Sequence, residues 1–150
     1  MIRLGVIGYG VRADMLMDEL LTLPGEACLC AVADRNPERV KALMTKKGSK
    51  EALHSFEIDK IDGMLRKCPM DPDTIRFYRT AEEMLMQEEL DGVLVGTNCN
   101  THTHFAQLVM EKGIPLFLEK PVAVSRKEAA VLERLAKEAK APVVVYFPLR

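Results

Sequence analysis

Short apolar runs alternate with segments of helical period along the chain, and this alternation limits its possible folds more than any other feature. The apolar runs have the length of β-strands and stand at residues 2–8, 27–34, 75–78, 92–95, 114–118 and 143–146. Between them, apolar residues recur every three or four positions, the spacing that buries one face of a helix. Strands alternating with helices are typical of a parallel sheet covered by helices. The sequence therefore predicts an α/β fold with a doubly wound, mainly parallel sheet.

Helix start signals support this division of the chain. A helix is expected over residues 11–23, directly after the first strand, which we expect to be buried on both faces. Three later starts carry capping residues, namely Asn36 with Pro37, Thr80 with Glu83, and Ser125 with Glu128. Asparagine caps a helix and proline suits its first turn, while the other two pairs form capping boxes. The predicted helices thus begin where the strand pattern ends.

Residues 46–74 interrupt the regular alternation. The segment carries charge runs and an amphipathic stretch that includes Leu53, Phe56 and Leu65. A structureless loop of that length is uncommon inside a compact domain. We therefore expect a helical insertion there, within a single domain of 150 residues.

Composition argues against several classes of partner. The chain holds 21 basic and 22 acidic residues, for a formal net charge of -1. Nucleic-acid binders and binders of anionic membranes carry a basic surface, so neither partner is expected. The sequence also lacks the roughly 18 consecutive apolar residues of a membrane span and a cleavable leader pattern. We expect a cytoplasmic protein.

The four cysteines predict neither a zinc site nor a redox pair, because none of them forms a C-x-x-C motif. They are Cys28, Cys30, Cys68 and Cys99. We expect reduced thiols, most of them buried, with Cys28 and Cys30 on one face of a strand because they alternate with Leu29. The three scattered histidines predict no metal site.

A glycine-rich motif stands where the first strand gives way to the first helix. It has the pattern G-x-G-x-x-A and comprises Gly8, Tyr9, Gly10, Val11, Arg12 and Ala13. In this context Gly8 makes a tight turn, Gly10 leaves room for a pyrophosphate, and Ala13 lets the helix pack closely on the sheet. The helix amino terminus then faces the phosphates with free N–H groups. The sequence predicts a Rossmann dinucleotide-binding loop.

Asp34 is the expected acidic partner of that loop. It lies 21 residues after Ala13 at the end of the second predicted strand, where a carboxylate accepts the adenosine ribose hydroxyls. Asp34 disfavours a 2′-phosphate and predicts NAD, whereas the neighbouring Arg35 is suited to neutralise that phosphate or to stack on adenine, so NADP stays open. The alternative is a tight turn with a surface aspartate that caps Asn36 and Pro37.

Two further loops are expected at the same edge of the sheet. In the doubly wound order 3-2-1-4-5-6, ligands bind at the carboxyl ends of the strands, where the order reverses. The loop after residues 92–95 is rich in small and polar groups and runs to His102. The loop after residues 114–118 is Glu119-Lys120-Pro121. We expect both loops to meet the glycine-rich loop.

The order and spacing of these motifs resemble one family. An amino-terminal G-x-G-x-x-A, a fourth-strand loop ending in His102, and G-x-x-x-x-x-E-K-P from Gly113 to Pro121 are similar to the Gfo/Idh/MocA family, named for glucose-fructose oxidoreductase, inositol dehydrogenase and rhizopine catabolism. The resemblance covers nearly the whole chain except the insertion. It implies an NAD(P)-dependent oxidoreductase in which Lys120 lies beside the nicotinamide and the substrate hydroxyl.

The same resemblance implies that Thr97, Asn98, His102 and Glu119 line the cofactor cleft. The chain departs from the family in one place, because the family usually has T-P-[NP] after the fourth strand and here Asn98 and Cys99 follow Thr97. Without proline to fix the backbone, a looser loop is one alternative. Cys99 is then either a reactive thiol or a half-buried bystander.

Lys120 also has a physical argument of its own. Pro121 restricts the residue before it to extended backbone, which aims a side chain. An ammonium group there stabilises the alkoxide that develops on a substrate alcohol as hydride leaves. The alternative is a surface lysine of structural role. For His102, a core or capping role competes with a catalytic one.

Members of the family continue past the sixth strand into a second domain that holds the substrate. We therefore expect residues 1–150 to be the dinucleotide-binding domain, with the substrate domain absent from this chain. The implied activity transfers hydride between the nicotinamide and a sugar, a cyclitol or a similar polyol, in a full-length form that is homo-oligomeric. The alternative function is a non-catalytic module that senses or sequesters the dinucleotide.

Overall fold

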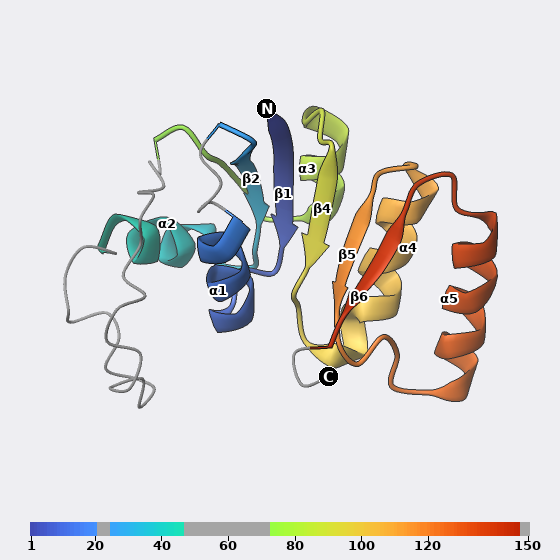
Figure 1. Cartoon of the computed structure of the whole chain (residues 1–150). Helices are drawn as coiled ribbons and strands as arrows, with labels where there is room; N and C mark the ends of the chain where they lie inside the picture. Colours follow the sequence, from blue (N-terminus) through green and yellow to red (C-terminus); the bar gives the residue numbers. More distant parts are fainter. Residues whose placement is uncertain (21–24, 47–72, 148–150) are drawn as a thin grey trace.

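The computed structural model describes residues 1–20, 25–46 and 73–147 and shows one parallel sheet (Figure 1). Its strands are β1 (Ile2–Ile7), β2 (Ala27–Ala33), β3 (Arg76–Tyr78), β4 (Gly92–Val95), β5 (Leu116–Glu119) and β6 (Val143–Tyr146). They are ordered β3-β2-β1-β4-β5-β6, and every neighbouring pair is parallel. The predicted doubly wound α/β fold is confirmed, and β1 lies at the centre.

Helices cover both faces of the sheet. They are α1 (Val11–Leu20), α2 (Pro37–Lys46), α3 (Ala81–Gln87), α4 (His102–Glu111) and α5 (Arg126–Glu138), with a short 3-10 helix, η2 (Cys99–Thr101), before α4. Two separate hydrophobic clusters form, one under α1 and α2 and the other under α3, α4 and α5. No helix in the described part of the chain is long and apolar enough to cross a membrane.

The predicted helix starts are confirmed by their hydrogen bonds. The Asn36 side chain accepts the backbone N–H of Arg39 at 3.1 Å. Thr80 accepts from the backbone of Glu83 at 3.2 Å. Ser125 and Glu128 form a reciprocal box, in which the Glu128 carboxylate also accepts the Val124 N–H at 3.1 Å.

Some predicted boundaries and burial patterns were wrong. The fifth strand begins two residues later than expected, because Ile114 N still donates to Val109 O at the end of α4. The first strand is not buried on both faces along its length, since Ile2, at the amino end of this central strand, is 49% exposed. The last predicted turn of the first helix and most of the predicted insertion, residues 47–72, lie outside the described residues.

The expectation that most cysteines are buried was also wrong for those described. Cys28 and Cys30 are half-buried and Cys99 is exposed, while Cys68 lies outside the described residues. Cys28 and Cys30 do share a face, with their sulfurs 3.3 Å apart. A bulge leaves Cys30 without a partner residue on β1. Burial, followed by the contact with Cys28, raises the pKa of Cys30 to about 11.

Glu88, directly after α3, is the centre of a charged cluster with residues of β1 and β3. The Glu88 side chain is 2% exposed and accepts bonds from Arg76 at 3.1 Å and Arg3 at 3.5 Å. The Tyr78 hydroxyl also donates to this carboxylate. Burial and the bond to Glu88 raise the pKa of Tyr78. Glu88 thus joins the beginnings of β1 and β3 to the end of α3.

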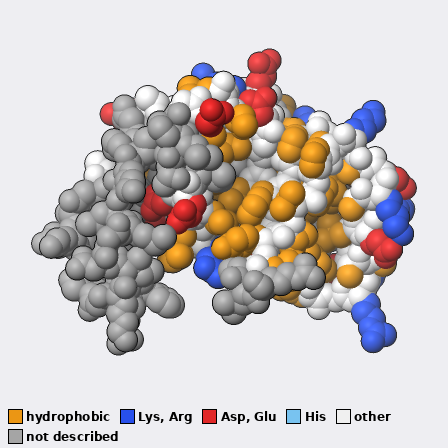
Figure 2. Space-filling model, viewed as in Figure 1, with side chains coloured by type: hydrophobic (Ala, Val, Ile, Leu, Met, Phe, Trp, Pro, Cys, Tyr) orange, Lys and Arg blue, Asp and Glu red, His pale blue; other side chains and the backbone are white. Residues whose placement is uncertain are grey.

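On the face of the sheet that carries α1, the strands β4, β5 and β6 are only partly covered by helices (Figure 1 and Figure 2). Figure 2 shows hydrophobic side chains gathered over β4, β5 and β6. Val144 on β6 is 51% exposed there, and a groove of about 280 Å³ includes Met17, Leu94 and Phe117 among its lining residues. This half of the sheet is therefore packed mainly from the side of α4 and α5.

Candidate dinucleotide-binding site

A cavity of about 740 Å³ opens at the carboxyl ends of β1, β2 and β4. Its volume lies within the range of ligand pockets. Seven of the predicted site residues line it, namely Gly8, Tyr9, Gly10, Asp34, Arg35, Thr97 and Asn98. They come from three loops that are distant in the sequence and that the strand order brings together. The cavity therefore lies where a doubly wound sheet binds ligands.

The two glycines of the loop have different physical roles. Gly8 has φ +80°, and a Cβ there would lie 2.5 Å from Thr97 Cγ2 and 2.9 Å from Thr97 Cα. Only glycine fits that conformation and that close approach. A Cβ on Gly10, in contrast, would meet nothing within 4 Å. The space over Gly10, beside the first turn of α1, is thus open, which fits a pyrophosphate.

Ala13 allows α1 to lie close to the sheet. It is fully buried, and a Cβ on Gly96 would lie 3.4 Å from the Ala13 Cβ and 3.2 Å from Gly8 O. The predicted packing role of Ala13 is consistent with these contacts. Val11 and Arg12 are exposed to solvent. Their side chains and that of Ala13 do not contribute to the described lining of the cavity.

Tyr9 lines the cavity and bonds three side chains. Its side chain is fully buried, and the hydroxyl donates to Asp14 at 2.9 Å. Its backbone N–H donates to Asp34 at 3.0 Å, and its carbonyl accepts from Arg39 at 3.1 Å. An aromatic residue between the two glycines therefore anchors the loop in the core. The loop is thus fixed to the core through Tyr9, while the space over Gly10 stays open.

Asp34 connects the glycine-rich loop to the start of α2. Its two oxygens accept separate backbone N–H groups, from Tyr9 at 3.0 Å and from Asn36 at 2.9 Å. A carboxylate has about four acceptor positions, so these bonds leave capacity for ribose hydroxyls. The turn-capping alternative for Asp34 is thus part of the same arrangement.

Three arginines surround this end of the cavity, two more than the sequence analysis considered. Arg35 follows Asp34 directly, Arg39 lies 3.6 Å from the Asp34 carboxylate, and Arg79 pairs with Glu38 at 2.7 Å. Arg39 was missed although it lies in the first turn of α2, which places it beside the end of β2. Arg79 follows β3, the strand next to β2, so the strand order was the signal that would have found it.

The loop after β4 is held by Thr101. Its hydroxyl lies 2.8 Å from both Thr97 Oγ1 and Asn98 O, and its backbone N–H donates to Asn98 O at 2.9 Å. These bonds close the 3-10 turn η2 without a proline. The looser-loop alternative is therefore not supported, and Cys99 in that turn is exposed rather than half-buried.

His102 was expected in the cofactor cleft, but its side chain does not contribute to the described lining. It is 1% exposed, with Nδ1 2.7 Å from Pro121 O and Nε2 3.0 Å from Thr97 O. Helix α4 begins at this residue and turns the ring under the loops rather than toward the cavity. Among the described residues, no group of three His, Cys, Asp or Glu side chains could hold a metal ion.

Glu119 and Lys120 also lie outside the described lining of the cavity. Glu119 is 5% exposed, and its Oε1 has no hydrogen-bond partner among the described residues. Lys120 is exposed at the end of β5. The structure therefore gathers the glycine-rich loop and Asp34 in one cavity, whereas Glu119 and Lys120 lie outside its described lining.

Fold and cleft together define a dinucleotide-binding domain of the Rossmann class. The chain belongs to the Gfo/Idh/MocA oxidoreductase family, whose NAD-binding Rossmann-fold model matches residues 2–147. This confirms the family resemblance of the sequence motifs.

Individual relatives agree with this assignment. The rhizopine catabolism protein MocA of Rhizobium meliloti is 40% identical over 55 residues, 37% of this chain and 17% of that protein. The myo-inositol 2-dehydrogenase of Thermotoga maritima is 25% identical over 145 residues, 97% of this chain and 35% of that protein.

Among solved structures, the WlbA dehydrogenase of Chromobacterium violaceum, in complex with NADH and UDP-GlcNAcA, has a similar fold. It matches with a TM-score of 0.72 at 22% identity, over 97% of this chain and 34% of that one. The chain thus spans about a third of the length of this structure and of the inositol dehydrogenase.

Proposed function

We propose that this chain is the cofactor-binding domain of an NAD-dependent oxidoreductase that acts on a sugar, a cyclitol or a similar polyol. The observation that carries the proposal is that Gly10, Asp34 and Thr97 line one common cavity, in a chain of an NAD-binding family. The names of the relatives support this substrate class, since they include myo-inositol 2-dehydrogenase and D-apiose dehydrogenase.

The cofactor is held by the glycine-rich loop and Asp34. The open space over Gly10 and the amino terminus of α1 take the pyrophosphate, because N–H groups at a helix start attract anions. The remaining acceptor capacity of Asp34 takes the ribose hydroxyls and favours NAD over NADP. Arg35 and Arg39 line the cavity near Asp34 and can neutralise a 2′-phosphate, so weaker binding of NADP is also proposed.

Lys120 is the proposed catalytic residue. The nicotinamide, when bound, supplies the hydride chemistry. The Lys120 ammonium donates a hydrogen bond to the substrate alcohol oxygen and stabilises negative charge as it develops there. Support comes from its exposed place directly after β5, the strand next to β4, whose following loop lines the cavity. Glu119 before it is buried and is paired with Tyr146 of β6.

A longer form of the protein is part of the proposal. The chain spans about a third of the length of the inositol dehydrogenase and of the WlbA structure, which supports a second domain that holds the substrate. We propose that the full-length protein is a homo-oligomer. We place this protein in the cytoplasm. Productive hydride transfer needs a substrate held at reacting distance, and that task falls to the second domain.

The test compares the 150-residue chain with a chain extended through its second domain. The short chain should bind NAD⁺ in calorimetry yet show no polyol oxidation by NADH absorbance. The extended chain should turn over and lose that activity in Lys120→Ala. Robust turnover by the short chain would contradict the two-domain proposal. Binding without turnover in the extended chain, over a panel of polyols, would favour the sensor function.

A further inference from the structure

We infer that His102 is a positioning residue that fixes the Lys120 loop against the loop lining the cofactor cleft. The inference rests on the proposed function for the role of Lys120, but it starts from a separate observation. The His102 ring is buried between two loops and bonds the backbone of both, with Nε2 3.0 Å from Thr97 O and Nδ1 2.7 Å from Pro121 O.

The two carbonyls belong to the segments whose relative position matters for the reaction. Thr97 lines the cavity, and its backbone lies so close to Gly8 that no side chain fits between them. Pro121 directly follows Lys120 in the chain. One imidazole ring therefore connects the dinucleotide loop to the lysine loop. Movement of Pro121 relative to Thr97 would break one of the two bonds.

Few side chains can make this connection. Both acceptors are carbonyl oxygens, and the two nitrogens of histidine point in different directions. A protonated ring donates to both carbonyls, whereas a neutral ring donates to one of them through its single N–H and packs its other nitrogen against the second. The ring is 1% exposed, so water has little access to replace a lost bond. Removing the ring leaves two backbone carbonyls without this partner, which favours rearrangement of the more exposed Lys120 loop.

The expected consequence is a loss of alignment rather than of cofactor binding. Thr101 holds the Thr97 loop independently, so the cavity should keep its shape without His102. A displacement of about 1 Å at a catalytic group can cost about a hundredfold in rate. In the extended protein, His102→Ala should therefore lower kcat by about tenfold to a hundredfold, with the Kd for NAD⁺ nearly unchanged.

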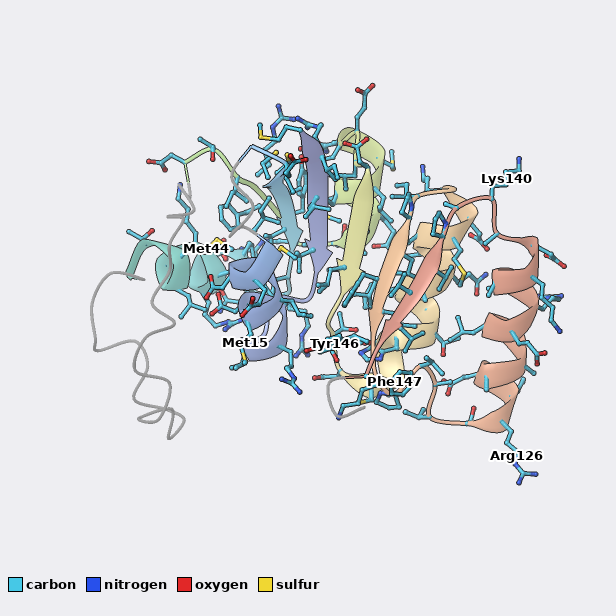
Figure 3. All side chains as sticks on the ribbon, in the orientation of Figure 1. Met15, Met44, Arg126, Lys140, Tyr146 and Phe147 are labelled. Carbon is cyan, nitrogen blue, oxygen red and sulfur yellow. The ribbon has the colours of Figure 1, made fainter. Side chains whose placement is uncertain are left out.

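The position of Lys120 can be measured in the 150-residue chain without turnover. Lysines are acetylated with acetic anhydride, with and without NAD⁺, and the rate at Lys120 is read by peptide mass spectrometry. With NAD⁺ at about ten times its Kd, nine-tenths of the chain is occupied, so protection of Lys120 can approach about tenfold. Lys140 is the internal reference, because it lies near the other end of β6 from Tyr146, which pairs with Glu119 (Figure 3).

We expect NAD⁺ to protect Lys120 in the wild type, and His102→Ala to bind NAD⁺ but lose most of that protection. His102→Gln keeps hydrogen-bond donors on a single nitrogen, so its protection of Lys120 should lie between those of the wild type and His102→Ala. Val109→Ala is the matched control, since it also removes buried volume from α4. It should lower the melting temperature and leave the protection intact.

The outcomes separate the two proposals. Full protection in both His102 variants overturns the positioning role and leaves the proposed function standing. Loss of protection in Val109→Ala as well overturns it too, because the effect then reports general destabilisation. Absence of protection in the wild type removes Lys120 from the cofactor site, and with it both the catalytic proposal and this inference.

Discussion

Glu88 and Asp34 are both carboxylates that bond several groups. They lie near opposite ends of the strands, and they differ in how much acceptor capacity their hydrogen bonds leave free. Glu88, near the beginnings of β1 and β3, is almost fully buried and bonds Arg3, Arg76 and Tyr78. Asp34, at the end of β2, lies beside a cavity of about 740 Å³ and retains acceptor capacity. The first arrangement stabilises the fold, and the second leaves room for a ligand.

The comparison teaches that charge alone does not mark a binding site. Both ends of the strands gather arginines around an acidic residue. The useful signals are open volume and incomplete hydrogen bonding, as at Gly10 and Asp34. Substitutions near Gly10 and Asp34 should therefore change the affinity for NAD⁺, and substitution of Glu88 should change the free energy of unfolding.

The largest effect is expected for Gly10→Val. The side chain would occupy the open space over the loop and exclude the pyrophosphate, so NAD⁺ affinity should fall by about a hundredfold or more, near 3 kcal/mol. Nothing lies within 4 Å of the added Cβ, so the fold should be retained. Calorimetric titration and circular dichroism measure the two effects. Unchanged affinity in a folded variant would show that the loop is only a turn, and Gly10→Ala should be intermediate.

Glu88→Ala should show the reverse pattern. It leaves the buried Tyr78 hydroxyl without its acceptor, which costs about 1 to 3 kcal/mol of unfolding free energy. The affinity for NAD⁺ should stay within about twofold, because no residue of the cluster is among those described as lining the cavity. Urea denaturation gives the first value. The neighbouring, exposed Glu89→Ala is the control, and equal losses in both variants would remove the special role of the buried cluster.

Asp34→Asn tests cofactor choice at the ligand-binding edge. The wild-type chain should bind NAD⁺ more tightly than NADP⁺, because the carboxylate pairs with ribose hydroxyls and repels a 2′-phosphate. The substitution keeps one acceptor oxygen and removes the charge, so NAD⁺ binding should weaken by about 1 to 3 kcal/mol and the preference should narrow. Titration with both dinucleotides decides it. Equal or tighter binding of NADP⁺ by the wild type would contradict the role of Asp34.

The smallest effect concerns the pH dependence of stability. The folded pKa of Cys30, about 11, lies above its ordinary value of 9.0, so the folded state holds the thiol proton more tightly. This contribution is fully present below pH 9 and is lost as the pH rises through 11. Because the thiol is only half-buried, the decline should be about 1 kcal/mol or less.

Urea denaturation between pH 8 and 11.5 measures this decline, with Cys30→Ala lacking it and the exposed Cys99→Ala retaining it. An identical decline in all three proteins would assign it to other groups.

The fold and about half of the site residues were predictable because they depend on patterns between residues that are close in the sequence. Strand and helix positions follow from hydrophobic period and caps, and the roles of Gly8 and Gly10 follow from their spacing beside a strand. The partners of His102 were not predictable, because its two bonds reach Thr97 and Pro121, 5 and 19 residues away. Such bonds depend on how separate loops pack, which no local pattern encodes.

A crystal structure of the chain grown with saturating NAD⁺ tests the central claim most directly. The account predicts the pyrophosphate against the backbone of Gly10 at the start of α1. It also predicts the adenosine ribose within hydrogen-bonding distance of the Asp34 carboxylate, with the Tyr9 and Asn36 bonds to that carboxylate retained. A dinucleotide bound elsewhere on the molecule, or an empty cavity between Gly10 and Asp34 at saturating NAD⁺, would contradict it.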